Sequence, residues 1–103
     1  MADAHGALRS ALTGLFHPAT AEVRSSSQRR WSSLTFSGAR HRYAFRVSGE
    51  RAGAAVDGAT AAIGREDFAL DGHVVADIAI VGRRSRSPAL VEIELEALTV
   101  EAA

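Results

Sequence analysis

The sequence predicts an α+β fold, a two-layer sandwich in which two helices cover one face of a four-stranded sheet. Three observations predict it. Apolar residues recur with helical spacing in two segments, they alternate with strand spacing in two others, and the two kinds of segment follow each other along the chain. The expected order is α-β-β-α-β-β. The pattern leaves open whether the sheet is antiparallel or mixed, and which strands are neighbours.

The composition indicates a single domain over residues 1–103. With 47% apolar and 23% charged residues, one ordered core is expected. The formal net charge is zero, which gives no overall attraction to nucleic acid or to membranes. The absence of cysteine excludes disulfides, thiolate nucleophiles and cysteine-bound metals within this sequence.

No segment has the pattern of a signal peptide or of a membrane span, so we expect a cytoplasmic protein with no membrane partner. Every basic residue is arginine and alanine is abundant, a bias that GC-rich coding explains and that favours a bacterial source.

The first helix is predicted over about residues 3–16, because four large apolar residues there fall at i, i+4, i+7 and i+8. Asp3 is its expected N-cap. Pro18 ends it, since the residue before a proline disfavours the helical region. Residues 17–30 are polar and serine-rich, and they predict a connecting loop or at most a frayed edge strand.

A hairpin is predicted over residues 31–48, with Gly38 and Ala39 as a two-residue turn. In this register His41 lies on the mostly apolar face, and the arginines lie on the other. A second helix is predicted over residues 50–63, where small apolar residues recur with helical spacing and Gly64 stands at its end.

A second hairpin is predicted over residues 72–100. Both faces of its first strand are apolar, so the face away from the helices is expected to be covered by a loop or by a second subunit, which motivates a homodimer. Glutamates alternate with apolar residues in its second strand. The side chains expected to face the helices are Val74, Ala76, Ile78, Ile80, Val91, Ile93 and Leu95; those expected to face away are His73, Val75, Asp77, Ala79, Val81, Glu92, Glu94 and Glu96.

Asp77 is the one acid within the apolar run, and a carboxylate in that setting must be paired, hydrated or shifted in pKa. It is either a functional group, a general base or ligand, or the partner of an arginine in a neighbouring strand. His73 shares its predicted face but lies roughly 13 Å away along the strand. Asp77 and His73 are therefore the candidates for a catalytic role.

The predicted binding residues are those of the sheet face away from the helices. Cross-strand ion pairs are expected between its arginines and its glutamates, and an acidic surface for a basic partner is the alternative. The four histidines lack the spacing of a zinc motif, so neither a metal nor a cofactor is expected. The binding set is Arg40, Arg42, Arg46, Asp77 and Glu94.

These features favour a binding or assembly module that self-associates through the sheet face opposite the helices, and they do not favour an enzyme. Two alternatives remain. Six arginines and no acid between Val23 and Val47 could bind nucleic acid or phosphate. A small enzyme could carry a site around His73, Asp77 and Arg42. A homo-oligomer or another protein is the expected partner.

Overall fold

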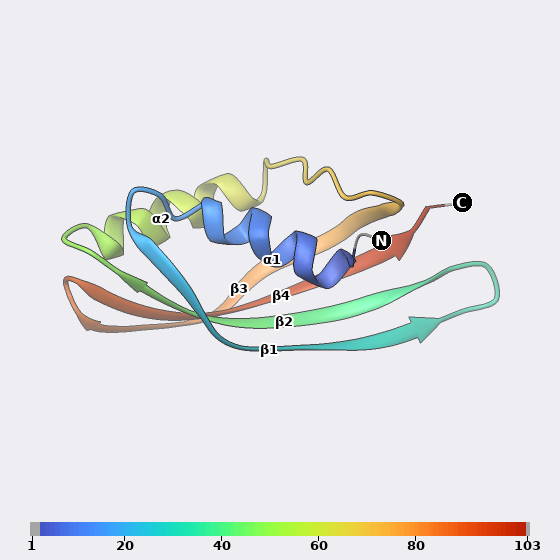
Figure 1. Ribbon diagram of the computed structural model, residues 1–103, viewed down its shortest axis with the longest axis horizontal. Helices are drawn as coiled ribbons and strands as arrows, with labels where there is room; N and C mark the ends of the chain where they lie inside the picture. Colours follow the sequence, from blue (N-terminus) through green and yellow to red (C-terminus); the bar gives the residue numbers. More distant parts are fainter. Residues whose placement is uncertain (1–2, 103) are drawn as a thin grey trace.

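The computed structural model describes residues 3–102 and has the predicted α+β architecture (Figure 1). Both helices lie on one face of a four-stranded antiparallel sheet whose strand order is β1-β2-β4-β3. The central strands are therefore β2 and β4, and β1 and β3 are the edges. The elements are α1 (Ala4–Gly14), β1 (Thr20–Ser32), β2 (Ser37–Ser48), α2 (Ala52–Ile63), β3 (His73–Ser87) and β4 (Leu90–Glu101).

Helix α1 begins where the sequence predicts. The carboxylate of Asp3 accepts hydrogen bonds from the backbone N–H groups of His5 and Gly6, which satisfies two donors that the first turn leaves unpaired. Leu8 and Leu12 of its apolar stripe are fully buried, as is Phe16 just after the helix. None of the helices in residues 3–102 is long and apolar enough to cross a lipid bilayer.

The core lies between the helices and the two central strands. The side chains of α2 that face the sheet are mostly small. Arg83 of β3 donates a hydrogen bond to the carboxylate of Asp57 at 2.5 Å, which connects this helix to the edge strand. The buried residues that face the helices from the central strands are Tyr43, Phe45, Val47, Val91, Ile93 and Leu95.

The polar segment 17–30, predicted as a connecting loop or a frayed edge strand, contains most of a long strand, because β1 runs from Thr20 to Ser32. This strand pairs with β2 on one side only. An edge strand with mostly exposed side chains needs no apolar alternation, so serine and arginine are tolerated along it. Hydrophobic periodicity alone therefore underestimates it.

The turn of the first hairpin lies before Gly38 and not at Gly38-Ala39. The backbone N–H of Ser33 donates to the carbonyl of Phe36 at 2.7 Å and closes the connection. Gly38 lies within β2, opposite Trp31 of β1 and Val100 of β4. The predicted register of residues 31–48 is wrong for this reason. Leu34 lies in this connection and is fully exposed at the hairpin tip.

A β-bulge in β3 changes which side chains face the helices. The register with β4 shifts between Val75 and Asp77, so one extra residue is accommodated there. Val75 packs against the core, although Val74 was expected to do so, and Val74 is exposed. After the bulge the predicted alternation is correct: Ile78 packs against the core and Asp77 is exposed.

Candidate functional site

The candidate site is the sheet face that the helices leave uncovered, which we call the open face. Its side chains follow from alternation, because residues between the buried ones of β2 and β4 must point away from the helices, and their cross-strand partners share that face. The open face consists of Glu22, Ser25, Ser27, Arg29 and Trp31 of β1; Arg40, Arg42, Ala44 and Arg46 of β2; Glu92, Glu94, Glu96, Leu98 and Val100 of β4; and Val74, Asp77, Ala79, Val81 and Arg84 of β3.

Arginines on β2 stand beside glutamates on β4, as predicted. Arg42 is paired in register with Glu96, and their side chains form an ion pair at 2.5 Å. Glu92 is in register with Arg46, but its ion pair is with Arg86, whose hydrogen bond lowers the pKa of this carboxyl group. These side chains are partly exposed, so each pair contributes little to stability.

Two other arginines of the open face have no acidic side chain beside them. Arg29 and Arg40 face each other directly across β1 and β2. Neither forms an ion pair with any residue in the range 3–102. Like charges directly opposite each other destabilise a sheet. The repulsion between Arg29 and Arg40 is therefore not offset by an ion pair such as the one that Arg42 forms with Glu96.

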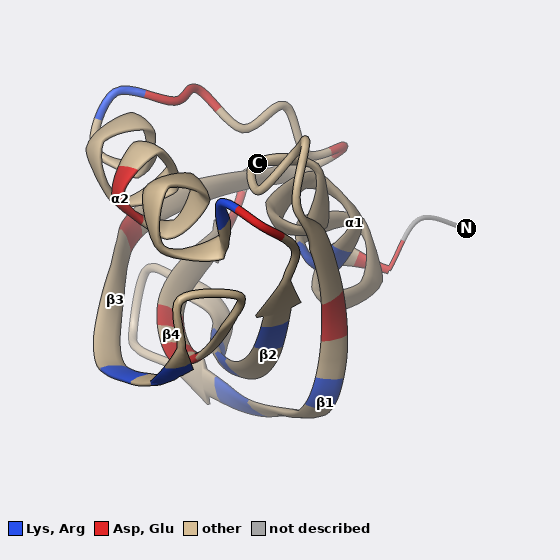
Figure 2. Cartoon of the chain, turned by 90° about the vertical axis from the view of Figure 1, so that its left-hand side faces the viewer, with Lys and Arg blue, Asp and Glu red and all other residues tan. Residues whose placement is uncertain are grey.

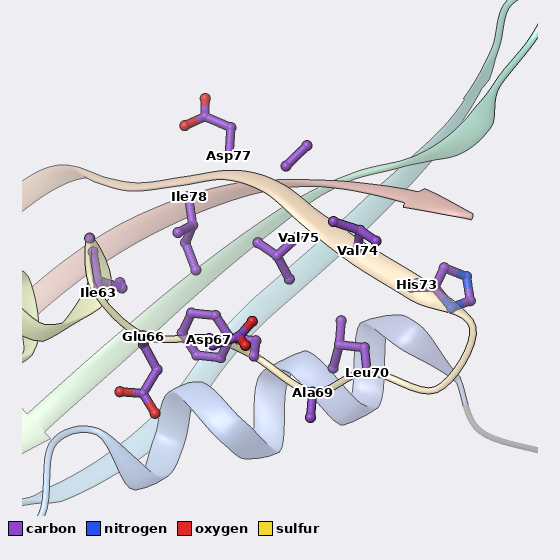
Figure 3. A pocket seen from close by; sticks show the side chains of 13 residues that line it. Ile63, Glu66, Asp67, Ala69, Leu70, His73, Val74, Val75, Asp77 and Ile78 are labelled. Atoms are coloured by element: carbon purple, nitrogen blue, oxygen red, sulfur yellow. The ribbon is translucent and has the colours of Figure 1, made fainter. Parts of the chain in front are cut away.

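Asp77 lies on the open face and is exposed. Figure 3 shows its side chain pointing away from the segment after α2, whereas Val75 and Ile78 point toward that segment. Its neighbour in β4 is Leu98. Within the part of the chain that the structure describes, its carboxylate has no ion-pair or hydrogen-bond partner, so an arginine of the same subunit does not bind it.

His73 does not meet Asp77. It lies at the first position of β3, where its Nδ1 lies 3.0 Å from the backbone carbonyl oxygen of Asp71. Both residues border a shallow hollow between β3 and the segment 64–72, but Figure 3 shows Asp77 directed away from it. Arg42 lies two strands away from Asp77 across the sheet, and both line one hollow of the open face that His73 does not border. The proposed catalytic trio is therefore not assembled.

A strip of apolar side chains crosses the β3 side of the open face. Val74 and Val81 are 56% and 50% exposed. Ala79 and the acid Asp77 lie between them along the strand, and on β4 Val100 stands beside Val74 and Leu98 beside Asp77. Apolar side chains exposed together on a sheet face indicate an interaction surface.

A buried polar cluster, which the sequence reasoning missed, joins α1 to the inner face of the sheet. His5 Nδ1 lies 2.9 Å from His41 Nδ1, and His41 Nε2 lies 2.8 Å from the hydroxyl of Thr99. The hydroxyl of Tyr43 donates to the backbone carbonyl of His5 at 2.8 Å. One Nδ1 must donate and the other accept, so a single proton lies between these two nitrogens.

Burial lowers the pKa of His41 to about 4 and also lowers the pKa of His5. Both rings are thus neutral at neutral pH, and this cluster holds the first turn of α1 onto β2. One signal could have revealed it: His5 stands three residues before Leu8, so it continues the apolar stripe of that helix.

Within residues 3–102 no group of three or more histidine or acidic side chains is arranged to hold a metal ion. Comparisons with protein-family models, with curated proteins and with solved structures found no match to this chain.

Proposed function

We propose that this protein is an assembly module that self-associates through the open face of its sheet. The observation that carries the proposal is the apolar strip on that face, where Val74 and Val81 are at least half exposed although both helices are already packed on the other side. Covering the strip would remove apolar surface from water, which stabilises an association by about 25 cal/mol per Å².

The charges beside the strip favour a second copy of the same chain as the occupant. The open face carries arginines on β2 and glutamates on β4, side by side. A partner of one charge sign would leave one of these columns without a counter-charge. A second copy offers both columns, so each can face its opposite.

The area of the open face suits a dimer. Its central strands are each 12 residues long. At about 3.3 Å per residue and about 4.8 Å between strands, four such strands give a face of roughly 40 Å by 19 Å, or about 760 Å². A standard stable interface buries about 800 Å² on each partner.

Replacing Ala79 with glutamate is expected to convert the dimer to a monomer. The change places a carboxylate in the middle of the apolar strip, beside Glu96, where a second copy would have to desolvate it. Light scattering after size exclusion at micromolar concentration measures the mass. The matched control is Ala61→Glu on the exposed side of α2, which is expected to keep the dimer.

Circular dichroism establishes that both variants are folded. An Ala79→Glu protein that keeps the mass of the unsubstituted protein would place the interface elsewhere.

Binding of an anionic polymer is the second candidate, and the opposed pair Arg29 and Arg40 favours it. A phosphate backbone could supply the counter-charge that both lack within residues 3–102. In this case single-stranded oligonucleotide is expected to bind at low salt with an affinity that falls steeply as salt rises, and Arg40→Ala is expected to weaken the binding. No detectable binding at low salt would remove this candidate.

A further inference from the structure

We propose that the two copies are related by a two-fold axis parallel to the strands, and that Arg29 of each copy pairs with Asp77 of the other. This inference rests on the proposed function and assigns a partner to the acid that has none within its own subunit.

The strand register divides the open face into rows that run across the sheet in the order β1, β2, β4, β3. One row reads Arg29, Arg40, Leu98, Asp77, with opposite charges at its two ends. Another row, six or seven residues further along the strands, reads Glu22, Arg46, Glu92, Arg84. Here too the two ends carry opposite charges, and so do the two middle positions.

Two aligned arrangements can pack this face against itself. With a two-fold axis across the strands, each strand lies over its own copy, so β2 arginines face β2 arginines and β4 glutamates face β4 glutamates. With the axis along the strands, every row is reversed on its partner, so β1 lies over β3 and β2 over β4. Only the second arrangement avoids contact between like charges.

Reversal of the rows gives Arg29 and Asp77 a partner, and it sets Arg40 opposite Leu98 of the second copy. Arg29 then faces Asp77 of the second copy, and Glu22 faces Arg84 of the second copy. In the middle of the sheet Arg46 faces Glu92 of the second copy. Gly38 has no side chain and faces Val100 of the second copy, so the backbone of β2 leaves room for it.

The shape of the open face brings the two ends of the first row toward one hollow. Side chains from all four strands line this hollow, among them Arg29 of β1 and Asp77 of β3. Figure 2 shows β1 and β3 on either side of the helices, as the two edges of the sheet. Arginine has a long side chain, and each of the two edge pairs contains one.

Charge reversal at one end of the row tests the pairing. Arg29→Glu and Asp77→Arg are each expected to weaken the dimer by at least about tenfold, because two pairs per dimer become like-charged. The double variant R29E/D77R is expected to recover the affinity. Recovery can only act between subunits, because the two residues lie on opposite edges of one sheet. The controls are Arg65→Glu and Asp67→Arg, exposed charges off the sheet.

Cross-linking then tests the orientation of the axis. The chain has no cysteine, so Ser27→Cys and Ala79→Cys each introduce a single thiol. With a short bismaleimide, a mixture of the two variants is expected to give a cross-linked dimer, while each variant alone gives little. If each variant cross-links with itself and the mixture adds nothing, the axis lies across the strands.

These outcomes distinguish self-association through the open face from the row-reversed orientation of the two copies. A protein that is monomeric at all concentrations contradicts both. A dimer that Ala79→Glu disrupts, but that shows neither charge-swap recovery nor the mixed cross-link, retains the open-face interface and overturns the row reversal.

Discussion

Replacing Gly38 with alanine is expected to lower the free energy of unfolding by about 3 kcal/mol, the range of a forced contact in a packed interior. A Cβ atom at this position would lie 1.9 Å from the carbonyl oxygen of Thr99 and 3.0 Å from Cα of Val100. Both are backbone atoms of β4, so no side chain can rotate away. The backbones of β2 and β4 would have to move apart at this position, which weakens the hydrogen bonds between the two central strands.

Gly58→Ala is the matched control. This glycine lies within α2, and nothing stands within 4 Å of the Cβ that alanine would add. Alanine is expected to raise the free energy of unfolding by up to about 1 kcal/mol, because it restricts the unfolded chain and favours the helix. Urea denaturation measures both changes. Equal stability of Gly38→Ala and the unsubstituted protein would contradict the close approach of β2 and β4.

Lowering the pH from 6.5 to about 4 is expected to cost about 3 kcal/mol of stability through His41. The unfolded chain has a histidine pKa of 6.5, and burial lowers the folded value to about 4. Between these values the unfolded state binds more protons, so stability rises with pH throughout this window and is lost as the pH falls through it. His5 from α1 and His73 from β3 also lower the pKa of His41, whereas the N-cap Asp3 raises it. Burial and Arg9 lower the pKa of His5.

The acidic groups affect stability only at the lower end of this pH window. The lowered pKa values of Glu92 and Glu101 weaken stability only as the pH falls below their ordinary value of 4.5. His41→Gln is expected to reduce stability at pH 7 and to flatten its dependence between pH 6.5 and 4.5. His17→Gln, an exposed histidine, should leave the dependence unchanged. Urea titrations at several pH values measure this, and an unchanged slope in His41→Gln would contradict the role of the buried pair.

The predicted fold class is correct because both helices and the central strands carry clear apolar periods. Strand β1 is the exception, since an edge strand with exposed serines and arginines resembles a loop in its pattern. Gly38 was predicted to be a turn residue. In the structure it lies within β2, where the backbone of β4 comes so close that a side chain would not fit, and only the three-dimensional register shows this. The bulge near Ala76 reverses the side-chain phase of Val74 and Val75, and no property of the local sequence marks it.

The sequence predicted which charged residues lie on the open face better than it predicted how they pair. Alternation in β2 and β4 places the arginines and glutamates correctly, because these central strands run without a bulge in their mutual register. Asp77 was identified as unusual, but the proposed pairing with an arginine of its own subunit is absent within residues 3–102. His5 and His41 are 36 residues apart in the sequence and meet only because α1 packs on β2. Hydrophobic periodicity predicts the two elements but not how they pack on each other.

The mass in solution tests most directly the proposal that the open face binds a second copy of this chain. Light scattering over a range of concentrations from low to high micromolar is expected to give twice the chain mass of 10.8 kDa, with Ala79→Glu at the single-chain value. A mass of one chain for the unsubstituted protein across that whole range would contradict it.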